Sequence, residues 1–129
     1  MTTLALLTTA LLFGGAVLFS FGFAVFLLKN TEEKEARRLL RAAFPHFYVL
    51  VIGLSALGAA LALPSDRVSA GILAAIALST IPARQVLMPA INAATDAGDK
   101  ARFAKLHGAS VVLGLVQIAG MAYVLTRFV

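Results

Sequence analysis

The sequence predicts an all-α integral membrane protein built as a four-helix transmembrane bundle. Of its 129 residues, 60% are hydrophobic and 13% are charged, a balance that is too apolar for a soluble domain. The charged residues gather in short blocks between four long apolar runs. One run, from Leu106 to Thr126, has no charged side chain. A helix that rises 1.5 Å per residue needs a run of about this length to cross a hydrocarbon layer about 30 Å thick.

The apolar runs predict one transmembrane domain over residues 1–129, with spans at about 4–28, 44–63, 68–94 and 100–128. No Lys or Arg precedes the first run, so we expect a retained span rather than a cleaved signal. Ala16, Ser20 and Ala24 recur every four residues on this span, a spacing typical of a face that packs closely on another helix. Such faces also permit a homo-oligomer.

The segment from Asn30 to Arg41, NTEEKEARRLLR, predicts a short amphipathic helix on the membrane surface between spans one and two. Asn30 can cap this helix, and Glu33 and Arg37 have the spacing of an i,i+4 ion pair. Its cations suit anionic lipid head groups. Pro45 leaves the carbonyl of Arg41 without a helical partner, so we expect the chain to bend before span two.

The distribution of cations predicts the orientation. Eight Lys and Arg residues lie in the segments that connect spans one and two and spans three and four, against two on the opposite side. Connections rich in Lys and Arg remain in the cytoplasm. We therefore expect a multi-pass protein of the cell inner membrane with both termini away from the cytoplasm.

Several function classes are disfavoured by the inventory of side chains. The absence of Cys excludes disulfides, thiolate metal sites and Cys nucleophiles. No nucleic-acid partner is expected, because the cations that give the net charge of +5 sit between membrane segments. No carboxylate lies inside a span, so acid–base catalysis within the membrane would rest on His alone, which disfavours an enzyme without excluding one.

Polar side chains fall at helical spacing on spans three and four. Span three carries Gln85, Met88, Asn92 and Asp96 at i, i+3, i+7 and i+11. Span four carries a second stripe, formed by His107, Ser110, Gly114, Gln117 and Met121. Because polar groups that face lipid cost several kcal/mol, we expect these stripes to face the bundle interior. The predicted polar seam consists of Arg84, Gln85, Asn92, His107, Ser110 and Gln117.

Arg84 lies in the interior of span three, well away from both of its ends, which makes it a candidate site residue. The alternative is that its side chain snorkels to the interface. We expect His46, Arg84 and His107 to share one bundle interior. The two histidines could then hold a haem or a metal ion with Met88 as a further ligand, although no HxxxH spacing supports this, or His107 could be an interhelical hydrogen-bond partner.

Four stretches carry a family resemblance: FGG at Phe13 to Gly15, RAAFPHFYVL at Arg41 to Leu50, LMPAIN at Leu87 to Asn92, and RFAKLHGASVVLGL at Arg102 to Leu115. Together they resemble the four-span family that includes transmembrane protein 205, whose bacterial members are classed as a domain of unknown function. The most specific part is F-x-x-L-H-G-x-S, from Phe103 to Ser110. The resemblance marks His107, Ser110, Pro89 and Asn92 as motif positions, while Gly114 stands where many relatives carry Asn.

The resemblance implies an integral membrane protein without an established catalytic activity, and animal members are associated with resistance to metal-containing drugs. Our first hypothesis is a non-enzymatic membrane protein that handles a small solute or metal-related species through the polar seam, with no resident cofactor. The second is a haem- or metal-binding redox module that uses the two histidines. The third is an accessory subunit of a larger membrane complex.

Overall fold

The computed structural model describes residues 2–129, and over this range every regular element is helical. The elements are α1 (Thr2–Val17), η1 (Leu18–Phe23), α2 (Ala24–Asn30), α3 (Glu33–Ala62), α4 (Arg67–Pro82), η2 (Ala83–Leu87), α5 (Met88–Asp96) and α6 (Lys100–Thr126). The segments η1 and η2 are π-helical turns, each continuous with the α-helices on either side. Four helices in the described range are therefore long and apolar enough to span a membrane: Thr2–Asn30, Glu33–Ala62, Arg67–Asp96 and Lys100–Thr126.

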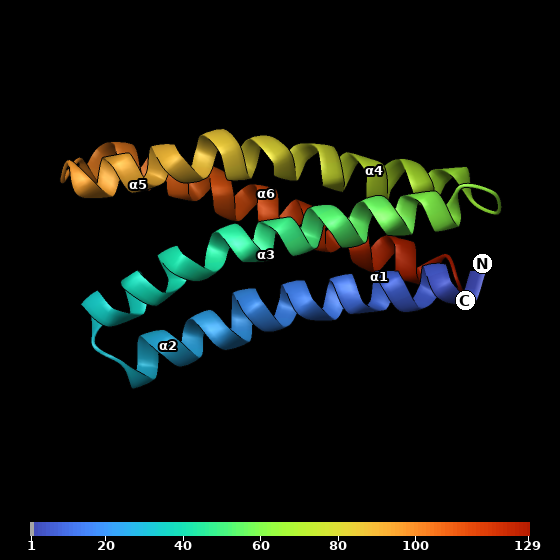
Figure 1. Cartoon of the computed structure of the whole chain (residues 1–129), viewed down its shortest axis with the longest axis horizontal. Helices are drawn as coiled ribbons and strands as arrows, with labels where there is room; N and C mark the ends of the chain where they lie inside the picture. Colours follow the sequence, from blue (N-terminus) through green and yellow to red (C-terminus); the bar gives the residue numbers. More distant parts are fainter. Residues whose placement is uncertain (1) are drawn as a thin grey trace.

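The four helices form a bundle in which each packs on two neighbours. Helix α1 packs on α3 and α6, and α4 packs on the same two helices from the other side. At the opposite end, α2 packs against α3 while α5 packs against α6. Figure 1 shows the result: the helices run close together near the chain termini, and the pair α2 and α3 spreads away from the pair α5 and α6 at the other end. The bundle is thus closed at one end and splayed at the other.

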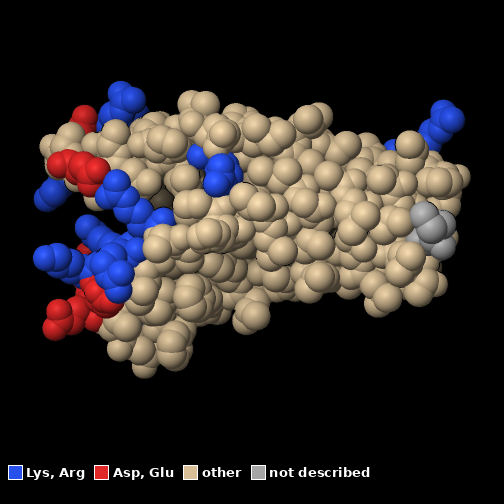
Figure 2. Space-filling model, in the orientation of Figure 1, with Lys and Arg blue, Asp and Glu red and all other residues tan. Residues whose placement is uncertain are grey.

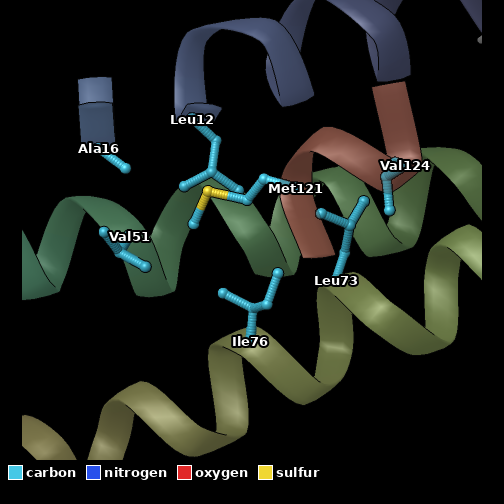
Figure 3. Close-up of a cluster of buried hydrophobic side chains, with 7 residues drawn as sticks. All are labelled: Leu12, Ala16, Val51, Leu73, Ile76, Met121 and Val124. Carbon is cyan, nitrogen blue, oxygen red and sulfur yellow. The ribbon is translucent and has the colours of Figure 1, made fainter. Parts of the chain in front are cut away.

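The hydrophobic core lies in the closed part of the bundle. Leu12, Leu73, Met121 and Val124 are at most 2% exposed and come from α1, α4 and α6. Ala16, Val51 and Ile76 complete this cluster, and the seven side chains converge from four helices in Figure 3.

Gly58 allows α1, α3 and α4 to approach closely. A Cβ at this position would lie 3.1 Å from Cδ1 of Leu73 and 3.7 Å from Cγ2 of Thr8. A small residue is therefore needed where the three helices meet.

Between its charged ends, the outside of the bundle is also apolar. Leu78 and Val116, for example, are 67% and 64% exposed. A bundle in water would place polar side chains there, whereas one in lipid needs an apolar exterior and internally satisfied backbone groups. The chain is a multi-pass integral membrane protein, as the sequence predicts.

Charged side chains gather at the splayed end, where blue and red atoms crowd one end of the molecule in Figure 2. At the closed end, Nε and Nη2 of Arg127 donate to the two carboxylate oxygens of Asp66 at 2.8 and 3.0 Å and form an ion pair. Asp66 also caps α4, because its side chain accepts from the backbone N–H groups of Val68 and Ser69. This carboxylate therefore joins the α3–α4 turn to the end of α6.

The predicted surface helix over residues 30–41 is wrong as a separate element. Asn30 ends α2, Thr31 and Glu32 are extended, and a single helix then runs from Glu33 through Pro45 to Ala62. Proline removes one backbone donor, and a membrane helix tolerates that loss because its other backbone bonds persist. The amphipathic stretch is the first turns of α3, where Arg37 Nη2 lies 2.6 Å from Glu33 Oε1 as its spacing predicts.

Candidate functional site

A cavity of about 400 Å³ lies between the helices where the bundle splays. All four spans contribute to its wall, which is mostly apolar. The cavity extends from the charged end of the bundle to the hydrophobic core. Arg41, Asn92 and His107 line it toward the charged end, and Val51 and Met121 line it at the core. In Figure 2 the charged end is notched, with blue side chains on both sides of the notch.

The stripe on α6 lines this cavity along its whole length. His107, Ser110, Gly114, Gln117 and Met121 all belong to the wall. They share one face because α6 is a regular α-helix from Lys100 to Thr126, so the 3.6-residue period holds throughout.

Gln117 is the polar group deepest in the wall. Its Nε2 donates to Oγ of Ser79 at 2.8 Å and to Oγ1 of Thr80 at 3.0 Å, both on α4. These bonds tie α6 to α4 at the level where α4 approaches η2. The two hydroxyl partners were not anticipated from the sequence, because Ser79 and Thr80 do not lie on the predicted stripes.

Span three brings only half of its predicted polar stripe to the cavity. Met88 and Asn92 line the wall, whereas Gln85 is exposed and does not. The cause is η2, in which the N–H of Met88 bonds to the carbonyl of Ala83, five residues back. This π-helical turn contains one extra residue, which rotates the preceding part of the span by about 100° relative to α5. The predicted i, i+3, i+7 register across this turn is therefore wrong.

Arg84 lies in the same π-helical turn and does not line the cavity either. Its Nε donates to the carbonyl oxygen of Pro45 on α3 at 3.2 Å, and its Nη1 donates to Oε1 of Gln85 at 2.8 Å. The side chain is half-buried. Arg84 thus bridges η2 and α3 instead of facing the polar seam.

The two histidines do not share the bundle interior that we expected. His107 is exposed at the charged end, where it lines the cavity and stacks on Phe103 with ring centroids 5.2 Å apart. His46 is exposed and does not line the cavity. The reason is helical phase, because Phe44, Tyr48 and Val51 define the face of α3 that meets the cavity and His46 lies on the opposite face.

Aromatic rings that we did not assign to a site form much of the cavity wall on α3. Phe44, Phe47 and Tyr48 line it, and Phe47 stacks on Phe19 of η1 with ring centroids 4.2 Å apart. A signal for this face was present: with Val51, these residues lie at i, i+3, i+4 and i+7.

The small residues of the first span also line the cavity. Ala16, Ser20 and Ala24 belong to its wall. Their spacing predicts close packing on another helix, and Ala16 does pack in the hydrophobic core. Farther along the span, Ser20 is exposed and Ala24 is half-buried, because the neighbouring helices diverge there. In the splayed half, small side chains leave space rather than bring helices together.

An ion pair between helices lies at the charged end of the cavity. Nη1 and Nη2 of Arg41 donate to the two carboxylate oxygens of Asp96 at 2.8 and 3.0 Å. Both side chains are exposed, at 47% and 61%. Arg41 is also the single charged residue in the cavity wall among residues 2–129.

Within residues 2–129, no group of three or more His, Cys, Asp or Glu side chains is placed so that it could hold a metal ion. Met88 and His107 both line the cavity, and Met88 lies on α5.

The sequence was compared with protein families, curated proteins and solved structures. A family described as "Domain of unknown function (DUF4149)" matches residues 7–100. The chain belongs to this family. Neither a curated protein nor a solved structure matches the chain. The DUF4149 match covers the first three spans and the start of α6, and so includes the parts of α3 and α5 that line the cavity.

Proposed function

We propose that this DUF4149 protein is a non-enzymatic membrane protein that binds a small, largely apolar molecule in the cavity between its spans. The observation that carries the proposal is the cavity itself. Its volume of about 400 Å³ lies within the range of known ligand pockets, about 300 to 1,000 Å³. Such pockets are lined mainly by apolar and aromatic side chains with a few placed polar groups.

The chemistry of the wall supports binding rather than catalysis. Phe21, Phe44, Phe47 and Tyr48 supply aromatic surface, while the polar seam contributes Asn92, His107, Ser110 and Gln117. No Asp or Glu lines the cavity among the described residues. Acid–base catalysis in this cavity would therefore rest on His107 alone.

The resemblance to the family of transmembrane protein 205 is part of the same proposal. Of the four motif positions, Asn92, His107 and Ser110 line the cavity, and Pro89 follows the π-helical turn that rotates Gln85 away from it. The haem or metal alternative loses support, because His46 lies on the opposite face of α3 from the wall that contains His107.

We also propose that the splayed end faces the cytoplasm and that the protein resides in the cell inner membrane. What supports this is the collection of cations at that end, since Lys and Arg bias connections toward the cytoplasm. The cavity then opens toward the cytoplasmic leaflet.

The test uses a compact, neutral photoreactive probe, adamantane diazirine, with the protein in phosphatidylcholine vesicles. Val51 and Met121 line the cavity and are only 3% and 1% exposed, so lipid-dissolved probe reaches them only through the cavity. Leu73 is 0% exposed and lies outside the wall, so it reports background labelling. We expect labelled peptides that contain Val51 and Met121 and none that contain Leu73.

A pair of glycine variants controls for the location of the probe. Gly114 lines the cavity and Gly53 is exposed on α3, and a Cβ at either meets no atom within 4 Å. Gly114→Phe fills the cavity and should abolish labelling of Val51 and Met121, whereas Gly53→Phe should leave it intact. Equal labelling of Met121 in wild type and Gly114→Phe would refute the proposed binding site.

A further inference from the structure

The polarity of the cavity wall changes along its length. Toward the charged end the wall contains Arg41, Asn92 and His107, and toward the core it contains Val51 and Met121 of the hydrophobic cluster in Figure 3. His107 and Met121 are fourteen residues apart on a regular helix, which corresponds to about 21 Å. A molecule that fits this gradient has a polar end and a long apolar chain.

The polar end of the wall specifies the charge of the head group. Arg41 is the one charged residue in the wall over residues 2–129, so the field there favours an anion. Its guanidinium already binds the carboxylate of Asp96 through two nitrogens, at 2.8 and 3.0 Å. This two-pronged geometry matches a planar carboxylate, which a ligand can present as well as Asp96 does.

We propose that the occupant is a long-chain carboxylate, whose head group takes the place of Asp96 on Arg41 and whose chain lies against Phe44, Phe47 and Met121. This inference rests on the proposed binding function of the cavity. The exchange replaces one carboxylate on Arg41 with another, so the guanidinium is paired both before and after the ligand binds. Asp96 is 61% exposed and enters solvent when displaced, and exposed ion pairs contribute little to stability. Asp96 thus competes with the ligand and regulates its binding.

The experiment compares three probes that differ only in the head group: palmitate, methyl palmitate and palmitylamine, each with a diazirine at the far end of its chain. The full-length protein is kept in phosphatidylcholine vesicles at a pH where palmitate is ionised. Labelling of Met121 and Val51 is measured against Leu73, as for the neutral probe. Palmitate should label these residues at least about tenfold more than palmitylamine, the factor expected for one charge-assisted hydrogen-bonded pair.

Variants of the ion pair test the proposed exchange. Arg41→Gln should lower palmitate labelling by about tenfold and leave methyl palmitate unchanged, since the ester does not need the cation. Asp96→Asn removes the competitor and should raise palmitate labelling. Arg127→Gln breaks the matching pair at the closed end of the bundle, where Arg127 does not line the cavity, and should leave labelling by palmitate unchanged.

The outcomes separate the ligand class from the site. Equal labelling by palmitate and palmitylamine, or wild-type palmitate labelling in Arg41→Gln, would overturn the carboxylate proposal. If Gly114→Phe still abolished labelling by all three probes, the cavity would remain a binding site for apolar molecules. If Gly114→Phe did not reduce labelling, the proposed function itself would fail. Should Arg41→Gln fail to fold, an unchanged response in Asp96→Asn would also overturn the exchange.

Discussion

Arg84 of η2 donates from its Nε to the carbonyl oxygen of Pro45 on α3, over 3.2 Å. The bond joins the proline inside α3 to the π-helical turn of span three, two of the places where this half of the bundle departs from a regular α-helix. A cation within a membrane span is a candidate for a functional role. Here its partner is a backbone carbonyl on a neighbouring helix, which is a structural role.

The first prediction concerns this bridge. Arg84→Met retains much of the apolar stem but removes the donor, so the free energy of unfolding should fall by about 1 kcal/mol. Photolabelling of Met121 in the cavity should remain at the wild-type level, because Arg84 does not line the wall. The two measurements are denaturant unfolding in detergent micelles and labelling in vesicles. A loss of cavity labelling with unchanged stability would assign Arg84 to the site instead.

The second prediction concerns the contact of α1, α3 and α4 at Gly58. Gly58→Leu places side-chain atoms where Leu73 and Thr8 already lie, and overpacking of this kind costs about 1 to 3 kcal/mol. Gly53→Leu, on the exposed face of the same helix, is the matched control and should have little effect. Thermal unfolding of the two variants in the same detergent measures the difference. Equal melting temperatures would contradict the close packing of these helices.

The third prediction concerns pH and the ion pair at the closed end. The hydrogen bond from Arg127, followed by that from Ser69, lowers the pKa of Asp66 far below its usual value. A carboxylate with a lowered pKa contributes stability above the pKa of the unfolded chain, about 3.9, and loses it as the pH falls below that value. The melting temperature of wild type should therefore decline in acid more steeply than that of Asp66→Asn.

The matched variant for this pH prediction is Asp99→Asn. Asp99 caps α6 through the N–H of Arg102 but has no salt-bridge partner among residues 2–129. Its acid response should remain close to that of wild type. Parallel acid profiles of wild type and Asp66→Asn would show that the Arg127 pair does not contribute.

The fourth prediction concerns orientation. The sequence contains no Cys, so single cysteines can be introduced without a background. Ser65 lies in the turn between α3 and α4, and Ala97 lies in the turn between α5 and α6. A membrane-impermeant maleimide added to intact cells, with the outer membrane opened where there is one, should label Ser65→Cys at once and Ala97→Cys only after the inner membrane is permeabilised. The reverse pattern would invert the topology and place the cavity toward the other leaflet.

The fold could be predicted from the sequence because membrane spans depend on length and apolar composition alone. The cavity face of α6 could also be predicted, because the helix is regular and the spacing of its residues gives their positions around its axis. The ion pairs Arg41–Asp96 and Asp66–Arg127 could not be predicted from the sequence. Each joins residues more than fifty positions apart, and their proximity depends on the tertiary packing.

The errors in the predicted site have three physical causes. Spacing arguments assume 3.6 residues per turn, and η2 breaks that assumption between Gln85 and Met88. His46 and His107 were predicted to lie together because both are near the same end of their spans. Depth in the membrane does not specify which side of a helix a residue occupies. Small residues on span one were interpreted as a packing face, although the same side chains can equally leave a space where helices diverge.

The splayed end also affects the surrounding lipid. Figure 1 shows in outline a bundle that is narrow at the termini and broad at the charged end, so its cross-section changes along the direction of the spans. In a bilayer, lipids beside such a wedge would have more room to fill in one leaflet than in the other, and this shape would favour a membrane that curves toward the narrow end. Any process that draws α2 and α3 toward α5 and α6 would reduce that preference, which couples the shape of the bundle to the shape of the bilayer.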